Sequence, residues 1–140
     1  MSGIVCAIRG GPDSQRAIDY AIKFAEENDI RLYFLYVVNL VYLRSTSTKR
    51  LNNIAMEYHR MGEFILLMAQ ARAASRGVRA DNFVRRGNVS EKIVDICKET
   101  QAKHLVMGMP CNQESYFVEE TLGKFVKTIE AQCNITVKIV

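Results

Sequence analysis

Two glycine-containing loops carry the residues with the clearest potential for ligand chemistry. The first loop is residues 9–13, Arg-Gly-Gly-Pro-Asp, and the second is residues 108–113, Gly-Met-Pro-Cys-Asn-Gln. Glycine lets the backbone come close to a ligand, and a helix that follows such a loop offers free N–H groups to a phosphate. Either loop is therefore a candidate for the ligand site.

Signatures of catalysis and of metal binding are missing elsewhere in the sequence. Neither His59 nor His104 has a neighbouring motif for a nucleophile or a metal. Glu119 and Glu120 are adjacent in a predicted helix, so their carboxylates point apart and do not form a catalytic pair. Ser90 follows a helix-capping residue and is expected to belong to the first turn of that helix. We therefore expect no catalytic residue.

The chain has four cysteines: Cys6, Cys97, Cys111 and Cys133. They show no C-x-x-C spacing and no flanking histidines, which argues against a zinc site and against a redox pair. Structural or incidental roles are expected for them. Cys111 alone lies in a predicted loop and is the candidate for a reactive thiol.

Length and composition are those of one globular domain spanning residues 1–140, with 49% apolar and 24% charged residues. No apolar run approaches the about 20 residues of a membrane span, and no signal peptide precedes the first strand, so a cytoplasmic protein is expected. The net charge of +4 comes from dispersed cations, with small groups at Lys49-Arg50 and Arg85-Arg86. These predict solvated surface and not a nucleic-acid partner.

Five segments have the patterns of strands. Residues 3–8 and 31–38 are continuously apolar, which is typical of strands buried on both faces, and the first is placed in the middle of the sheet. Residues 78–86 are more charged and predict an edge strand. Residues 104–109 predict a further apolar strand, and residues 135–139 alternate as in a closing strand.

Four segments have helical patterns. Asp13 or Ser14 is predicted to cap the first, whose apolar stripe is Ala17, Ile18, Ala21, Ile22 and Ala25. Residues 44–50 predict a loop before a long helix with the stripe Leu51, Ile54, Ala55, Tyr58, Ile65, Met68 and Ala69. Gly62 weakens this helix by about 1 kcal/mol relative to alanine, a cost that packing can absorb. The remaining two stripes are Val89, Ile93, Ile96 and Cys97, preceded by a capping box of Asn88 and Glu91, and Val118, Leu122, Phe125, Val126 and Ile129.

This alternation of strands and helices predicts an α/β fold with a doubly wound, mostly parallel sheet and helices on both faces. In such a sheet, ligands bind beyond the carboxyl ends of the strands, where both glycine loops fall.

Several segments together resemble the universal stress protein family, over essentially the whole chain. They are the first strand with its turn and Ala-rich helix, Tyr36-Val37-Val38, Arg86-Gly87-Asn88-Val89-Ser90-Glu91-Lys92-Ile93, Ala102-Lys103-His104-Leu105-Val106-Met107-Gly108 and Ile135-Thr136-Val137-Lys138-Ile139-Val140. The resemblance implies a five-stranded sheet of order 3-2-1-4-5 and a homodimer formed through the last strand. It also implies candidate cofactor-binding positions at Ala7, Arg9, Val37, Met107, Gly108, Cys111, Gly123 and Lys124.

Nucleotide-binding members of that family carry G-x-x-G, nine residues and G-[ST], with an Asp after the first strand. Here Gly108 matches the first glycine, Cys111 stands at the second and Arg9 replaces the Asp. Strict spacing places Thr121-Leu122 at the third glycine and its hydroxyl partner, whereas a two-residue insertion places Gly123-Lys124 there. A Cβ at position 111 crowds the backbone cradle, so either no cofactor or a weakly bound adenine nucleotide (ATP or AMP) is expected.

Three functions remain open at this point. The first is a non-catalytic, homodimeric stress-response or regulatory protein that acts through partner contacts and resembles members without the nucleotide motif. The second is an ATP-binding protein or slow ATPase that uses the loop after Gly108, and the third is a sensing subunit of a transporter or kinase. A separate hypothesis is that Arg9 and Lys124 hold a different phosphate-bearing ligand, against the alternative that both are ordinary surface cations.

Overall fold

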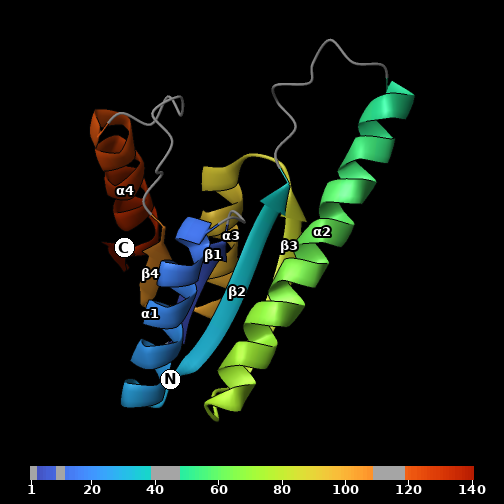
Figure 1. Cartoon of the computed structure of the whole chain (residues 1–140). Coiled ribbons are helices and arrows are strands. Elements are labelled where there is room, and N and C mark those ends of the chain that lie inside the picture. Colours follow the sequence, from blue (N-terminus) through green and yellow to red (C-terminus); the bar gives the residue numbers. More distant parts are fainter. Residues whose placement is uncertain (1–2, 9–11, 39–47, 109–118) are drawn as a thin grey trace.

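Five parallel strands form a single sheet in the computed structural model, which describes residues 3–8, 12–38, 48–108 and 119–140 (Figure 1). The strands are β1 (Gly3–Ile8), β2 (Arg31–Val38), β3 (Ala80–Arg86), β4 (His104–Met107) and β5 (Thr136–Ile139). Their order is β3-β2-β1-β4-β5, and every neighbouring pair is parallel. The predicted fold class and strand order are therefore confirmed.

Four helices of the described chain cover the two faces of the sheet: α1 (Pro12–Asn28), α2 (Thr48–Ser75), α3 (Val89–Thr100) and α4 (Glu119–Cys133). One apolar core lies between the sheet and helices α1 and α2, and a second lies between the opposite face and helices α3 and α4. Because successive side chains of a strand point to opposite faces, β1 and β2 contribute to both cores. Both strands are therefore buried on both faces, as their continuously apolar sequences predicted.

The central and edge positions of the strands agree with their composition. β1 pairs with β2 on one side and β4 on the other, whereas the more charged β3 lies at an edge. β3 begins at Ala80 and not at Val78, because Gly77 has a φ of 76° and Val78 donates its N–H to the Ala73 carbonyl at 2.9 Å. This hydrogen bond closes the end of α2 before the strand begins.

Two predicted helix starts need correction. α1 begins at Pro12, so Asp13 and Ser14 lie in its first turn and do not cap it. Proline fits the first helical position because its φ is already helical and its missing N–H would have had no partner. α2 begins at Thr48, inside the predicted loop, because polar residues do not by themselves prevent a helix. The Asn88 cap of α3 is confirmed, since its Oδ1 accepts the Glu91 N–H at 3.2 Å.

The predicted apolar stripe of α2 also needs correction. Ala55 and Ala69 are buried, but Met68 is 60% exposed, and Leu66, which was not assigned to the stripe, is 1% exposed. At about 100° per residue, positions 66 and 68 are about 160° apart around the axis, so they cannot both face the sheet. No helix in the described part of the chain is long and apolar enough to cross a membrane.

A second apolar face of α2 points away from the sheet. All the large hydrophobic side chains that are strongly exposed in the described part of the chain lie on it: Met56, Met61, Phe64, Leu67 and Met68. They span an arc of about 140° around the helix, roughly opposite the buried residues that meet the sheet. The helix is therefore apolar on two sides, and the sheet covers only one of them.

Candidate functional site

Three of the predicted site residues lie together near the carboxyl ends of neighbouring strands. Ala7 in β1 is the register partner of Met107 in β4 and of Leu35 in β2, and Val37 lies two residues beyond Leu35. Their side chains belong to the core under α3 and α4; Ala7 and Val37 are half-buried and Met107 is buried. Gly108, half-buried, follows β4 directly at this edge. These residues form an apolar surface at the edge of the sheet where a ligand was predicted.

The two alternatives for the third glycine position, with and without the insertion, differ in their place relative to the first turn of α4. The first four N–H groups of a helix have no partner within it, and in α4 these belong to residues 119–122. Thr121-Leu122 falls in this set, whereas Gly123 is the fifth residue of α4 and Lys124, which is exposed, is the sixth. The alignment without an insertion therefore places the third-glycine position among the free backbone donors of this helix.

The same helix begins with Glu119 and Glu120. In the sequence these two acidic residues directly precede Thr121-Leu122.

Arg9 and Cys111 lie outside the described residues, so their predicted roles stay predictions. The same holds for the remainder of the first loop, residues 10–11, and of the second, residues 109–113.

The start of α3 is fixed to the same edge of the sheet. Gly87 donates its N–H to the Val38 carbonyl at 2.9 Å, which holds the start of α3 next to the end of β2. The Ser90 hydroxyl donates to Asn88 Oδ1 at 2.7 Å, beside the Glu91 N–H. Ser90 thus belongs to the cap, as predicted.

The two histidines are used in structural contacts. His59 Nε2 lies 2.7 Å from a carboxylate oxygen of Glu63, one turn further along α2, and the His104 ring lies 4.7 Å from the Phe24 ring. Among the described residues, no three His, Cys, Asp or Glu side chains gather closely enough to hold a metal ion.

Burial suppresses the reactivity of two thiols. Burial raises the pKa of Cys97 to about 12, with Cys133 adding a smaller effect, and burial alone raises the pKa of Cys6. Cys133 is half-buried and donates weakly to the Val94 carbonyl at 3.8 Å. Thiolates are the reactive form, so Cys6 and Cys97 are suited to packing and not to nucleophilic chemistry.

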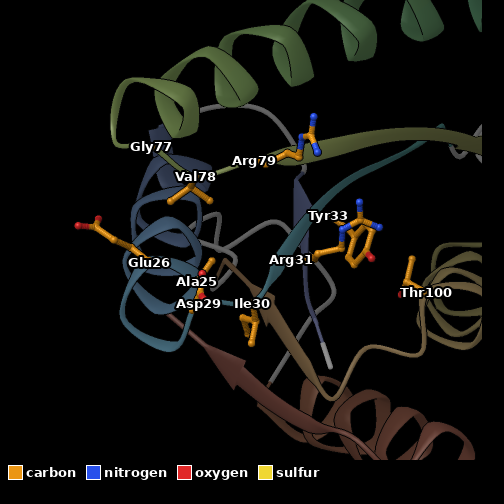
Figure 2. Close-up of a pocket in the computed structure, with 10 residues that line it drawn as sticks. All are labelled: Ala25, Glu26, Asp29, Ile30, Arg31, Tyr33, Gly77, Val78, Arg79 and Thr100. Carbon is orange, nitrogen blue, oxygen red and sulfur yellow. The ribbon is translucent and has the colours of Figure 1, made fainter. Parts of the chain in front are cut away.

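A cavity of about 610 Å³ lies at the opposite, amino-terminal edge of the sheet, where no ligand site was predicted. Figure 2 shows its lining, which comes from the ends of α1, α2 and α3 and the starts of β2 and β3: Ala25, Glu26, Asp29, Ile30, Arg31, Tyr33, Gly77, Val78, Arg79 and Thr100. Arg31 begins β2 and Arg79 immediately precedes β3, each one residue before the register pair of Leu32 and Ala80, so the two cations belong to the starts of neighbouring strands. An arginine at the start of each of two strands was the available sequence signal.

The charges around this cavity oppose one another. Arg31 and Arg79 form no ion pair among the described residues, and such a cation pair would favour an anion. Three helices end here, however, and the partial negative charge of their C-termini disfavours a bound anion. Glu26 is already paired with Arg76 at 2.9 Å. The geometry therefore selects no class of ligand.

Comparison with protein families gives one match. The model of the universal stress protein family matches residues 1–137. A search of the curated proteins finds no match.

Solved structures of universal stress proteins are similar to this chain. A family protein from Burkholderia pseudomallei is 22% identical, with a TM-score of 0.70 over 99% of this chain and 95% of that one. Universal stress protein UspA from Lactobacillus plantarum is 16% identical, with a TM-score of 0.77 over 99% and 97%. A family protein from Arabidopsis thaliana with AMP bound is 14% identical, with a TM-score of 0.67 over 100% and 91%. At these identities, the similarity establishes the fold.

Proposed function

Because this chain belongs to the universal stress protein family, we propose that it is a non-catalytic stress-response or regulatory protein that works in the cytoplasm. It acts as a homodimer through contacts with protein partners, and it binds adenine nucleotide weakly or not at all. Nucleic acids and membranes are not among its proposed partners.

The observation that carries this proposal is the departure of the sequence from the nucleotide-binding pattern of the family. In the nucleotide-binding pattern, the third glycine and its hydroxyl partner fall at Thr121-Leu122 under strict spacing, within the first turn of α4. In the sequence, two acidic residues, Glu119 and Glu120, stand directly before them. Cys111 in place of the second glycine and Arg9 in place of the Asp add to this, because both change the groups that contact a nucleotide.

The exposed edge of β5 supports the homodimer. β5 pairs with β4 on one side, and among the described strands none pairs with its other side. Such an edge is a template for pairing with another chain, and a two-fold axis beside it would join two sheets into one.

Nucleotide titration tests the proposal. The protein is purified without added nucleotide, extracted and analysed for bound small molecules, and ATP is then titrated calorimetrically with and without Mg²⁺. We expect no co-purified nucleotide and no saturation by ATP at about 100 micromolar, a free energy of binding weaker than about 5.5 kcal/mol. The Glu119→Gln/Glu120→Gln variant is expected to bind ATP about 3- to 10-fold more tightly, because two repulsive charges are removed.

A matched control keeps this result interpretable. Glu130→Gln removes a charge from an exposed position near the other end of α4 and is expected to leave ATP binding unchanged. Micromolar binding of ATP by the native protein that Gly108→Val abolishes would contradict the proposal. It would instead support the second candidate, an ATP-binding protein or slow ATPase, which Gly108, Gly123 and the AMP-bound Arabidopsis thaliana relative favour.

A further inference from the structure

Two side chains form hydrogen bonds to backbone carbonyls of the edge strand β3. Gln70 of α2 donates from Nε2 to the Ala80 carbonyl at 2.6 Å. Arg85 of β3 donates from Nη1 to the Val84 carbonyl at 3.1 Å. In Figure 1, α2 runs alongside β2 and β3, which brings Gln70 of this helix within reach of the strand.

Both carbonyls point away from the sheet. Gly87, directly after β3, donates its N–H to the Val38 carbonyl of β2, so its backbone groups point toward β2. Because these directions alternate along a strand, the backbone groups of Ala80, Asn82 and Val84 point outward. The occupied carbonyls of Ala80 and Val84 therefore flank Asn82 on the edge that a further strand would have to meet.

Gln70 is held in place at this edge. Its Oε1 accepts a hydrogen bond from Asn82 Nδ2 at 3.3 Å, so the half-buried amide spans two outward positions of the strand. Such a two-sided contact fixes the orientation of the amide and keeps its donor on Ala80.

Arg85 is held in place by groups on the other face of the strand. Its guanidinium lies 5.1 Å from the centre of the Phe83 ring and 3.6 Å from Glu99 Oε2 of α3. A guanidinium has five N–H donors, so these contacts are compatible with the hydrogen bond to Val84.

The opposite edge of the sheet, at β5, differs in its backbone groups. Thr136 and Val140 donate to the Lys103 and Met107 carbonyls beside β4, so the backbone groups of Val137 and Ile139 point outward. Among the described residues, no side chain forms a hydrogen bond to either of these two. Outward groups of β5 are therefore available to a partner strand.

Charge differs between the two edges as well. β3 contains Asp81, Arg85 and Arg86, whereas Lys138 is the only charged residue within β5. Charged side chains on an edge strand discourage pairing with another strand, because pairing removes them from water. The charges and the occupied carbonyls thus both disfavour pairing of a further strand at β3.

We infer that Gln70 and Arg85 close the outer edge of β3 against a strand of a second copy, so that the sheet can be extended only at β5. A symmetric pairing of two β3 strands would displace both hydrogen bonds in each copy, four in all, before new ones form. The inference rests on the proposed function in that it extends the β5 homodimer. Closure of the β3 edge is a separate property, and it is tested with β5 blocked.

Substitution of both side chains in a background with β5 blocked tests the inference. Val137→Pro removes an outward donor of β5, and the two side chains are then replaced as Gln70→Met/Arg85→Met, which keeps their length and removes their donors. By sedimentation equilibrium, we expect Val137→Pro to be monomeric at about 100 micromolar and the triple variant to associate at least about 10-fold more tightly. Circular dichroism verifies that each variant is folded.

Amide hydrogen exchange shows where the copies meet. The outward N–H groups of Asn82 and Val84 are expected to exchange quickly in Val137→Pro. In the associated triple variant they should be protected at least about 10-fold, because they then donate to a neighbouring strand.

A control variant with the same two types of substitution distinguishes the loss of the carbonyl hydrogen bonds from the general loss of polar side chains. Gln15→Met/Arg79→Met, in the same Val137→Pro background, replaces two exposed residues that form no hydrogen bond to β3. Arg79 immediately precedes β3, so its loss lowers the charge of the same edge. This variant is expected to remain monomeric.

Three results would overturn the inference: a folded triple variant that stays monomeric, a control that associates as strongly, or association without protection of Asn82 and Val84. A native chain that proves monomeric would contradict the β5 homodimer alone, because the comparison at β3 does not use that contact. With β5 intact, Gln70→Met/Arg85→Met has two open edges and should form species larger than a dimer, since two such contacts generate an open chain of copies.

Discussion

Gly62 of α2 packs against the ring of Tyr36 in β2. A Cβ added at this position would lie 2.5 Å from Tyr36 Cδ1 and 2.9 Å from Cε1, inside the contact distance of carbon atoms. The Tyr36 ring is itself buried, so it has little room to move. The glycine that costs the helix about 1 kcal/mol relative to alanine therefore allows the close packing of helix and sheet.

We predict that Gly62→Ala lowers the free energy of unfolding by about 1–2 kcal/mol, because crowding outweighs the improved helix propensity. Urea denaturation followed by circular dichroism measures the change. In a Tyr36→Ala background the sign should reverse, since the ring that alanine would contact is gone. A Gly62→Ala protein that is more stable than the native one would show that packing is not close at this point.

At the scale of elements, each helix of the described chain has a residue with left-handed backbone within two residues after its end. These residues are Asp29 (φ 51°), Gly77 (φ 76°), Gln101 (φ 57°) and Asn134 (φ 51°). Asp and Asn tolerate this conformation better than most residues, and glycine adopts it without strain, but glutamine has neither advantage. At the end of α3, the Gln101 N–H still reaches the carbonyls of Cys97 and Lys98, so the cap forms despite the strain.

Gln101→Gly is expected to raise the free energy of unfolding by about 0.5–1 kcal/mol, because relief of left-handed strain exceeds the added flexibility of the unfolded chain. Gln101 is exposed, so the side chain itself contributes little. Gln101→Ala serves as the control and should give no gain, because alanine keeps the Cβ. Equal stabilisation by both substitutions in a thermal or urea melt would rule out backbone strain as the cause.

For the whole molecule, the two edges of the sheet bear on assembly. The N–H of Val137 points away from β4, toward the open side of β5, because its neighbour Thr136 donates to Lys103 beside β4. A proline at position 137 would thus remove a donor from the open edge without removing one from the sheet.

In the otherwise native chain, we predict a dimer that Val137→Pro converts to a monomer at about 50 micromolar. Val137→Ala loses the same side chain but keeps the N–H, and it should remain dimeric. Light scattering after size-exclusion chromatography measures the mass. A monomer before the proline is introduced, or a dimer after it, would remove β5 from the interface.

Local patterns predicted much of the fold. The bounds of β1 and β2, the edge position of β3 and the Asn88 cap all follow from residues that are neighbours in sequence. The first and second helix starts were wrong because Pro12 and Thr48 extend their helices into segments interpreted as a turn and a loop. The placing of Ala7, Val37 and Met107 at one edge required the strand register.

The sequence by itself determined the alternation of elements and the central place of β1, because burial on both faces requires a continuously apolar segment. It also determined the family resemblance and the departures at Arg9 and Cys111 from the nucleotide-binding pattern. Only the tertiary structure decided which side of α2 meets the sheet, why Gly62 is needed against Tyr36, and that Gln70 reaches the Ala80 carbonyl. These depend on contacts between different elements, and a periodic pattern such as that of α2, with apolar residues on two faces, does not specify which face is covered.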